Sequence, residues 1–562
     1  MSEGLTAELT DPRWSRAQPV AWAAIAILAV LASLTGITNG FALDDVHIIF
    51  ENQRLHSLAE AWRLFGQTYW PPEEGASLYR PLTAVAFSME WAIGRGSPLP
   101  FHLANIVLYA AASVALYRLA LLIVSPTAAF VAAALFAVHP LHVEVVANSV
   151  GQAELWVALI VFVSVARYIG ARRGGPLRTS EILIQTALYF CACMFKEHAI
   201  ILPALLMSAE LTLVNESGSL RARARRLWPL FVALAIAACV FVFVRTLVVG
   251  HLTQGGPNAL LRDATLLTRL FTMLRVSMEW VRLLFWPASL SADYSSRRIE
   301  AATSFDSTML PGLLVLVGAA AIAWSLRRSI PAATFGILWA GVTLLIPSNL
   351  ILVTGFILAE RALFLSSAGI AICAGIAIVH FAQAMKERGG FARFGPATLV
   401  FALLVAGIGR SSTRNRVWHD NDRLLRQTVL DVPTSYRAHW TLAEHLTDAG
   451  QTQEGLEEML LAVVLGKRDD PGLLSFAADR FRMANQCPRA MGMYRKALGI
   501  APDLPDLRFN ASVCLIQLGK LDEARALAHD GLVTLPADTH LLRVISVADS
   551  LANVSKENSP KS

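Results

Sequence analysis

The chain has 562 residues, of which 55% are hydrophobic and 16% are charged, whereas soluble domains carry about 25% charged residues. This composition excludes a wholly soluble protein and predicts a polytopic membrane protein with room for a soluble domain. The formal net charge is +6, but the basic residues fall in short clusters between apolar runs. Such clusters are typical of membrane topology, so we expect no nucleic-acid partner.

The apolar runs predict eleven membrane-spanning helices. A helix needs roughly 20 apolar residues to cross a bilayer, and fewer when flanking residues snorkel. The first run follows a polar segment with no obvious cleavage site, which predicts an uncleaved anchor. The expected spans are 20–40, 101–124, 126–142, 152–169, 181–195, 198–214, 228–248, 309–326, 331–347, 362–383 and 396–410.

Basic residues occupy alternate turns between these spans, as the positive-inside rule requires of cytoplasmic turns. With eleven spans, the N-terminus is then cytoplasmic and the C-terminal region is exported. The fifth and sixth spans are short and meet at Lys196-Glu197-His198. One broken helix is the alternative, but both flanking loops are basic, which favours a hairpin that reaches the far side.

Two long loops lie on the expected far side. The first, 41–100, begins with FALDDVHIIF, which places Asp44 and Asp45 directly after the first span. Charge beside a membrane is costly, so the pair suggests a catalytic base. The alternative is that both residues only end the helix and contact water. In the second loop, 249–308, charges recur at helical spacing over Arg269–Pro287, which predicts an amphipathic helix in the interface.

From Ser411 the composition becomes that of a soluble domain, with features that recur at about 34 residues. Gly450 and Gly519 lie two periods apart, and Pro502 and Pro536 lie one period apart. We interpret these features, with Ala443, Ala477 and Ala511, as three tetratricopeptide-type units over about 436–536. The expected fold is therefore all-α: a membrane domain over 1–410, an exported repeat domain over 411–552 and a disordered tail over 553–562.

Under this topology many polar groups at span ends face the same side as the aspartate pair. We expect a supporting polar cluster of His102, His139, His142, Glu144, Glu154, His198, Asn349 and Glu360. The stretch HPLHVE could hold a divalent metal, but its spacing matches no strong zinc pattern, and hydrogen bonding is the simpler interpretation. We therefore predict no metal site and no firmly implied cofactor.

Several stretches together resemble the transmembrane and tetratricopeptide-repeat O-mannosyltransferases, within the GT-C class of multispan glycosyltransferases. They are Asp44-Asp45, YRPL at 79–82, FHLAN at 101–105, LFAVHPLHVEVV at 135–146, KEH at 196–198, LLFWPASLSADYS at 283–295 and IPSNLILVTGFILAERALFLSSAG at 346–369. The resemblance covers nearly the whole chain. It departs at Gly151-Gln152-Ala153-Glu154, where the family tends to have Gly-Arg-Ala-Asp, and at Gln53, which replaces a usual Pro. The short repeat array looks bacterial, which would make the far side the periplasm and the membrane the inner membrane.

The resemblance implies transfer of a sugar, with mannose expected, from a polyprenyl-phosphate donor to a Ser or Thr hydroxyl of an exported protein. Asp44 or Asp45 would deprotonate the hydroxyl as it attacks the anomeric carbon, with inversion. Arg361, Lys196 and Arg80 are the candidates to hold the leaving phosphate. The alternatives are transfer to a glycolipid or surface glycan, and a non-catalytic membrane scaffold whose repeats recruit partners.

The six cysteines fall into two groups. Cys191, Cys193, Cys239 and Cys373 lie within expected spans, where they would pack as small apolar residues. Cys487 and Cys514 lie in the expected exported repeats, where disulfides form. A bridge between them would cross the junction between repeats two and three and stabilise the fold by roughly 3 kcal/mol. Two independent buried thiols remain the alternative.

Overall fold

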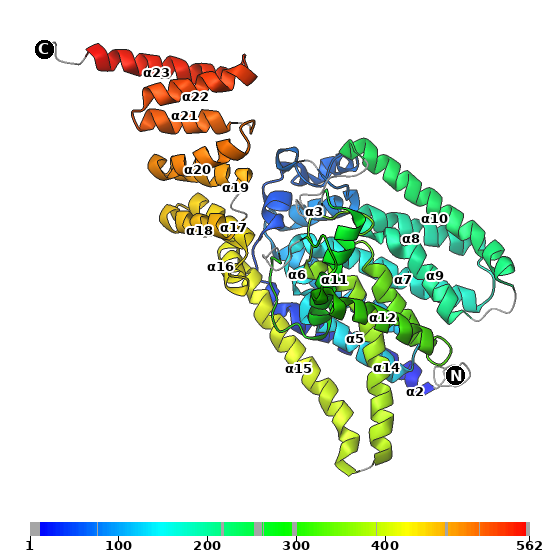
Figure 1. The fold of residues 1–562 in the computed structure, drawn as a ribbon. Coiled ribbons are helices and arrows are strands. Elements are labelled where there is room, and N and C mark those ends of the chain that lie inside the picture. Colours follow the sequence, from blue (N-terminus) through cyan, green and yellow to red (C-terminus); the bar gives the residue numbers. More distant parts are fainter. Residues whose placement is uncertain are drawn as a thin grey trace. The chain divides into compact units, whose positions relative to one another are not determined.

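The structure is a computed structural model, and it describes residues 12–75, 77–214, 219–251, 261, 263–294, 301–388, 390–466, 470–504 and 506–557. All regular structure within those ranges is helical, in agreement with the predicted fold class (Figure 1). The chain forms two compact units, of which the first runs to Leu424 and the second begins at Leu425.

Seven helical segments in the described ranges are long and apolar enough to cross a membrane, and these match seven of the predicted spans. They are Gln18–Gly36 of α2 and η1, Leu99–Leu121 (α4), Ser149–Arg173 (η7 and α7), Arg221–Val249 of α10, Ser307–Leu326 (η9 and α12), Glu360–Arg388 (η10 and α14) and Gly395–His419 (α15 and η12). The chain is thus a multi-pass membrane protein.

The other four predicted spans differ from straight membrane-crossing helices. The third consists of α5, Pro126–Ala137, and a second segment, Pro140–Ala147, bent by 48° at the break. The remaining three are the short helices α8 (Thr179–Phe195), α9 (Leu202–Leu213) and α13 (Pro331–Thr343). By helix length, the described residues therefore contain fewer membrane-crossing helices than the eleven predicted. Hydropathy alone did not reveal where polar turns interrupt the apolar runs.

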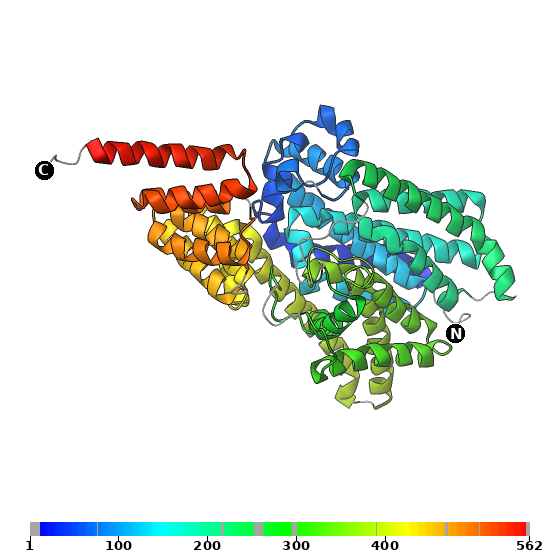
Figure 2. The same cartoon turned by 45° about the horizontal axis from the view of Figure 1, so that its top comes forward.

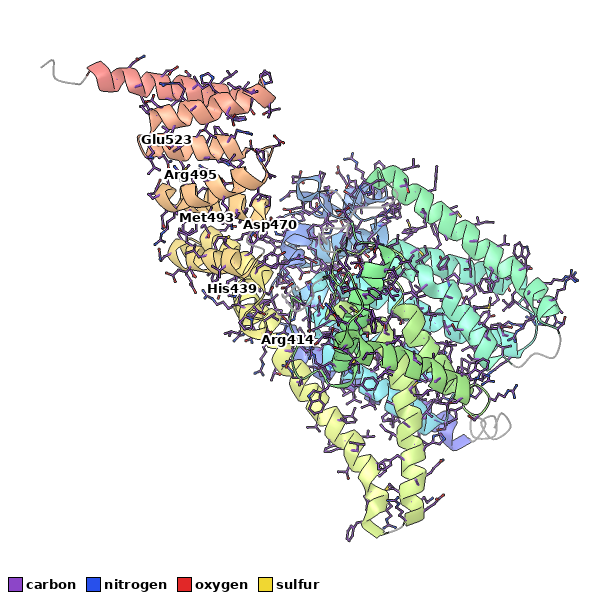
Figure 3. All side chains as sticks on the ribbon, viewed as in Figure 1. Arg414, His439, Asp470, Met493, Arg495 and Glu523 are labelled. Carbon is purple, nitrogen blue, oxygen red and sulfur yellow. A yellow bond between two sulfur atoms is a disulfide. The ribbon has the colours of Figure 1, made fainter. Side chains whose placement is uncertain are left out.

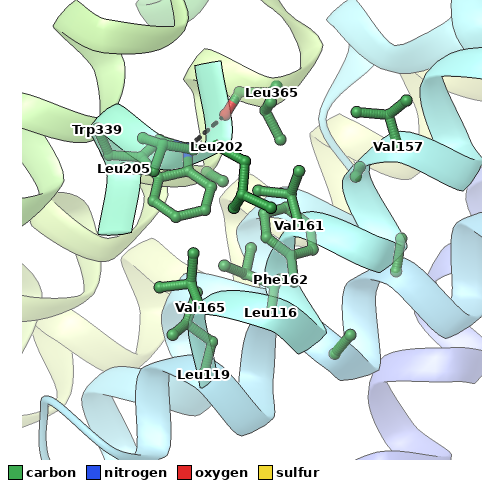
Figure 4. Close-up of a cluster of buried hydrophobic side chains, with 14 of the residues drawn as sticks. Leu116, Leu119, Val157, Val161, Phe162, Val165, Leu202, Leu205, Trp339 and Leu365 are labelled. Atoms are coloured by element: carbon green, nitrogen blue, oxygen red, sulfur yellow. Dashed lines mark hydrogen bonds between the residues drawn. The ribbon is translucent and has the colours of Figure 1, made fainter. Parts of the chain in front are cut away.

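The core of the first unit lies where α4, α7, α9 and α13 meet (Figure 4). Leu116, Phe162, Leu205 and Trp339 are fully buried there, and the Phe162 and Trp339 rings stack with centroids 5.7 Å apart. The indole N–H of Trp339 donates a 2.8 Å hydrogen bond to the carbonyl of Leu365. This bond satisfies the only polar atom of a large side chain in an apolar core.

A buried ionic network joins α7, α9 and α10 (Leu220–Val249). The Glu210 carboxylate is fully buried and accepts hydrogen bonds from Arg172 Nη2 at 2.8 Å, Arg223 Nε at 2.8 Å and the Tyr168 hydroxyl at 2.7 Å. Arg172 lies in the last turn of α7 and Arg223 lies near the start of α10. The network compensates a charge that would be very costly if it were buried alone.

The two long loops carry short helices of their own. The first loop contains η2 (Val46–Phe50), η3 (Gln53–Leu55), η4 (Leu58–Gly66), η5 (Pro72–Glu74) and α3 (Pro81–Gly94). The second contains α11, Leu266–Phe285, which agrees with the predicted helix at Arg269–Pro287. One side of α11 buries Val276, Trp280 and Leu283, so the helix is amphipathic as predicted, whereas its place in the membrane interface remains a prediction.

The first unit extends beyond the domain boundary predicted at residue 410. The helix α15, Gly395–Asn415, continues past that position, and the side chain of Asn415 donates a 2.8 Å hydrogen bond to the Ala32 carbonyl in α2. The side chain of Asn39 donates in turn to the Asn415 carbonyl at 3.0 Å. These contacts hold residues 411–415 against the first span, which the change in composition at Ser411 did not indicate.

The second unit consists of the part of α16 (Asn421–Asp431) from Leu425 onward, three antiparallel helix pairs and a last helix, coloured yellow to red in Figures 1, 2 and 3. The pairs are α17 (Tyr436–Asp448) with α18 (Thr452–Leu465), α19 (Pro471–Met483) with α20 (Cys487–Ile500), and α21 (Leu507–Gln517) with α22 (Leu521–Thr534). Ala443, Ala477 and Ala511 are fully buried in the first helix of each pair. The three predicted repeat units are confirmed.

The turn within each helix pair uses one left-handed residue. Gly450 has φ 82°, Asn485 has φ 57° and Gly519 has φ 72°. Gly and Asn are the residues that adopt this conformation most readily at a helix C-terminus. Asn485 therefore occupies, in the second repeat, the turn position that Gly450 and Gly519 occupy in the first and third.

The repeat unit also contains a disulfide. Cys487 at the start of α20 is bonded to Cys514 in α21, with Cα atoms 5.2 Å apart. Of the two alternatives left open by the sequence, the structure has the bridge. The last helix, α23, spans Thr539–Glu557, so residues 553–557 of the tail predicted to be disordered are helical, and the rest of that tail lies outside the described residues.

Candidate functional site

The two aspartates after the first span lie in different surroundings. Asp45 is fully buried, and its two oxygens accept hydrogen bonds from the backbone N–H groups of Ser149 at 2.9 Å and Val150 at 2.8 Å. Burial raises the pKa of Asp45 to about 7, although the two amide bonds act in the opposite direction. Asp45 therefore ties the first loop to the start of α7 and has no free oxygen for a substrate.

Asp44 is accessible. About a third of its side chain (33%) is exposed, and its Oδ2 lies 3.4 Å from Nη1 of Arg361. The residue before it, Leu43, has a positive φ of 51°, and its backbone N–H donates a 2.7 Å hydrogen bond to the Asn421 side chain. The strained turn directs the two neighbouring carboxylates to different sites, so only Asp44 is placed to meet a substrate.

Arg361 lies between two carboxylates. Its backbone N–H donates to Glu144 Oε2 at 2.8 Å, and its Nη1 lies 3.4 Å from both Glu144 Oε1 and Asp44 Oδ2. The ion-pair partners of Arg361 are thus Glu144 and Asp44, and not the adjacent Glu360. Glu360 instead accepts hydrogen bonds from the Ser291 N–H at 2.7 Å and the Tyr294 hydroxyl at 2.5 Å.

The other two predicted phosphate-binding residues are paired more closely. Arg80 donates from Nε and Nη2 to the two oxygens of Glu197, at 2.9 and 2.6 Å, and its guanidinium lies 5.0 Å from the centre of the Tyr69 ring. Lys196 forms an ion pair with Glu154. Burial lowers the pKa of Lys196, against the attraction of Glu154. Arg80 is therefore the least available of the three to a phosphate.

These pairs form one charged cluster, which we call the loop-end cluster. Arg361 is close enough to interact electrostatically with Glu154 and Arg80 as well as with Glu144 and Asp44. Lys196 interacts in the same way with both arginines. The predicted convergence of separate span ends thus occurs in the structure. The members are Asp44, Arg80, Glu144, Glu154, Lys196, Glu197, His198 and Arg361.

The remaining predicted site residues have partners elsewhere. His142 is buried between the Tyr109 hydroxyl and Ser367 Oγ, each 2.8 Å from a ring nitrogen. His139 Nε2 lies 3.1 Å from the Leu284 carbonyl, and His102 Nε2 lies 3.3 Å from the Gly40 carbonyl. Asn349 organises its own loop, because its Oδ1 accepts from Thr354 N at 2.7 Å. These residues hold the backbone around the loop-end cluster.

Sequence reasoning missed several residues that border the loop-end cluster. Tyr69 is almost fully buried, and its hydroxyl has no hydrogen-bond partner among the described residues. Gln152, noted only as a departure from the family pattern, donates a 2.6 Å hydrogen bond to Glu90. In the described part of the chain, no group of three or more His, Cys, Asp or Glu residues could hold a metal ion.

Comparison with known proteins shows which proteins this chain is similar to. The chain is 25% identical to the protein O-mannosyl-transferase F38B6.6 of Caenorhabditis elegans over 78% of its own length and 61% of the relative's. It is 23% identical to the protein O-mannosyl-transferase TMTC3 of Mus musculus over 84% and 54% of the two lengths. The chain resembles the TMTC-type protein O-mannosyl-transferases. The predicted resemblance is thus confirmed, although the chain spans less than two thirds of either relative.

Two further comparisons concern the fold. Residues 482–545 match the tetratricopeptide repeat family model, a range that contains α20, α21, α22 and the start of α23. The archaeal oligosaccharyltransferase AglB from Archaeoglobus fulgidus, solved in complex with an inhibitory peptide and a dolichol-phosphate, matches 78% of this chain and 59% of its own length. The identity is 13% and the TM-score is 0.42, which is too low to establish a common fold.

Proposed function

We propose that this protein is a membrane glycosyltransferase that moves a sugar, with mannose expected, from a polyprenyl-phosphate donor to a Ser or Thr hydroxyl of an exported protein. The observation that carries the proposal is the position of the accessible Asp44 carboxylate beside Arg361, at the end of the first span. A carboxylate and a guanidinium side by side supply the base and the phosphate-binding cation that this reaction needs. The similarity to O-mannosyl-transferases supports the same chemistry.

In the proposed reaction, Asp44 accepts the proton of the acceptor hydroxyl while the hydroxyl oxygen attacks the anomeric carbon. The bond from that carbon to the phosphate oxygen breaks, and the sugar is transferred with inversion. The phosphate departs as an anion and needs no proton, so positive charge is sufficient to stabilise it.

Arg361 is the proposed phosphate-binding residue. Its guanidinium is 27% exposed and makes 3.4 Å contacts to both carboxylates, which are long for charge-assisted hydrogen bonds. A phosphate could therefore replace these contacts with shorter ones. Lys196 is the second candidate, because its single amine contacts only one carboxylate oxygen of Glu154, and a donor phosphate could draw it away from that partner.

The proposed orientation places the loop-end cluster and the repeats on the non-cytoplasmic side, the periplasm if the protein resides in a bacterial inner membrane. The disulfide between Cys487 and Cys514 supports an oxidising surrounding for the repeats. The basic cluster Arg221–Arg226 at the start of α10 supports a cytoplasmic location for the opposite end. The repeat array would then bind the acceptor protein or a partner.

A reconstituted assay tests the proposal. The full chain in vesicles would be supplied with polyprenyl-phosphate mannose and a Ser/Thr-rich acceptor protein, and incorporated sugar would be counted. We expect transfer by the native chain and a 10²- to 10⁴-fold lower rate for Asp44→Asn. Glu51→Gln is the matched control, because Glu51 is an exposed carboxylate of the same loop whose ion-pair partner is His47. Equal rates for Asp44→Asn and Glu51→Gln would contradict the proposed base.

The same assay separates the alternatives. If sugar appears on a glycolipid or glycan while the protein acceptor stays unmodified, the acceptor is wrong and the donor chemistry stands. A scaffold would show no transfer with any acceptor, and Asp44→Asn would leave its partner binding unchanged.

A further inference from the structure

The first loop contains a short amphipathic helix, η4, whose apolar side chains divide between two faces. Ala61 and Leu64 are buried against the rest of the loop, whereas Trp62 is 69% exposed and Phe65 is 42% exposed. A 3₁₀-helix has three residues per turn, so Trp62 and Phe65 lie one above the other on the same side. This exposed face needs an apolar partner.

The depth of η4 follows from two contacts. The Tyr79 hydroxyl donates a 2.9 Å hydrogen bond to the Phe65 carbonyl, and the Tyr79 ring lies 6.2 Å from the ring of Phe241 in α10. Phe241 is inside the candidate span Arg221–Val249. The end of η4 is therefore tied through one side chain to a residue of a membrane-crossing helix.

The position of Phe241 along α10 indicates how deep in the membrane this contact lies. The basic residues up to Arg226 mark one membrane surface, and a hydrocarbon core of about 30 Å takes roughly 20 residues of helix from there. The opposite surface then lies about five residues, or roughly 8 Å, beyond Phe241. A tyrosine side chain reaches a similar distance, so the link through Tyr79 allows Phe65 to lie near that surface.

We propose that the exposed face of η4 (Trp62 and Phe65) is embedded in the lipid surface at the end of α10 opposite to the Arg221–Arg226 cluster. Trp is the residue most typical of this layer, because its ring is apolar and its N–H is polar. The flanking Glu60 and Arg63 form a 3.0 Å ion pair with each other and are both about half exposed, which suits the head-group region. A lipid surface thus matches both the apolar face and its charged edge.

Embedding η4 in the lipid surface would also position the loop-end cluster, an inference that rests on the proposed function. Tyr79 precedes Arg80, which holds Glu197 with two hydrogen bonds. A lipid-embedded η4 therefore fixes one side of the loop-end cluster at the level where a lipid-linked phosphate lies. The chemical class of ligand served by this placement is an amphipathic polyprenyl phosphate.

Nitroxide accessibility measures the depth without any assay of activity. The four free cysteines, Cys191, Cys193, Cys239 and Cys373, are replaced by alanine, and single spin labels are placed by Trp62→Cys and Phe65→Cys in the full chain in phosphatidylcholine vesicles. We expect at least threefold higher accessibility to oxygen, which concentrates in lipid, than to a water-soluble nickel complex. Glu73→Cys, in the exposed η5 of the same loop, is the matched control and should show the reverse.

Two outcomes would overturn the proposal. Labels at 62 and 65 that are as open to the nickel complex as the label at 73 would place the face in water. Labels that are closed to both agents would show a polypeptide cover, such as a second copy of the chain or a bound protein. Because transfer of sugar is not measured, failure here leaves the proposed function standing, and failure of the transfer assay leaves the depth of η4 unchanged.

Discussion

The Arg361 guanidinium lies 3.4 Å from the Asp44 carboxylate, although 317 residues separate them in the chain. This contact joins the end of the first span to the start of α14. It also brings the proposed base next to the proposed phosphate-binding group, so the two roles can be tested separately.

Replacing Arg361 should weaken donor binding more than acceptor binding. Loss of a hydrogen bond to a charged group costs about 1.5–3 kcal/mol, so Arg361→Ala should raise the Kd for a polyprenyl phosphate by about 10- to 150-fold. Arg361→Lys keeps the charge and should recover part of the affinity. Binding of a fluorescent polyprenyl phosphate to the full chain in vesicles measures both. An Arg361→Ala chain that binds the donor normally would instead leave Arg361 as a structural ion pair.

Asp45→Asn should destabilise the protein, whereas Asp44→Asn should not. Both Asp45 oxygens accept backbone N–H groups, and an amide would place its own NH₂ against one of these donors. An unsatisfied buried group costs about 1–3 kcal/mol, which should lower the Tm of Asp45→Asn in detergent. If the two variants melt at the same temperature, the stabilising role assigned to the hydrogen bonds between Asp45 and the backbone of Ser149 and Val150 is wrong.

The first repeat should loosen as the pH rises. His439 Nδ1 lies 2.5 Å from Glu458 Oε2, and its Nε2 lies 3.0 Å from the Pro433 carbonyl. The hydrogen bond to Glu458 raises the pKa of His439 above 6.5. The stabilisation is thus fully present below about pH 6.5 and is lost as the pH rises through the folded-state value.

Hydrogen exchange of α17 in the full chain checks this pH dependence. Loss of one hydrogen bond of about 1 kcal/mol corresponds to roughly fivefold faster exchange after correction for the intrinsic rate. His439→Gln cannot titrate, so its corrected exchange should not change between pH 5.5 and 8.5. A native chain that behaves like His439→Gln would contradict the assignment.

Removing the bridge should destabilise the repeats. Cys487→Ser with Cys514→Ser opens a loop with a sequence separation of 27 residues, which the chain-entropy estimate values at about 3 kcal/mol. Maleimide labelling of the unreduced, denatured native chain should modify four cysteines, Cys191, Cys193, Cys239 and Cys373. Labelling of all six would show that the bridge does not form.

Features that depend on a repeated local pattern were predictable from the sequence. The 34-residue period gave the helix pairs, because each pair buries an alanine at the same position and turns at a Gly or Asn. Charge clusters likewise indicated which span ends share a side, and the loop-end cluster unites most of them. Membrane composition and family resemblance were also sufficient for the overall class.

Features that depend on partners distant in the chain were not predictable. Asp44 and Asp45 are identical neighbours, and only the backbone of Ser149 and Val150 distinguishes the buried one from the exposed one. The pairing of Arg361 with Glu144, rather than with the adjacent Glu360, is set by where α14 packs. Helix length was also hidden, because the apolar run predicted as the span 331–347 continues past Thr343, where α13 ends.

The Glu210 network has a consequence for how the chain enters the membrane during synthesis. The helix α9 has 12 residues, too few to cross a bilayer, and a carboxylate released alone into lipid costs about 2.5 kcal/mol or more. Arg172 is made before Glu210, but Arg223 is made after it. Full pairing of the Glu210 carboxylate therefore needs α10 as well as α7, so we expect α7, α9 and α10 to be stable in the membrane only as one ionic unit.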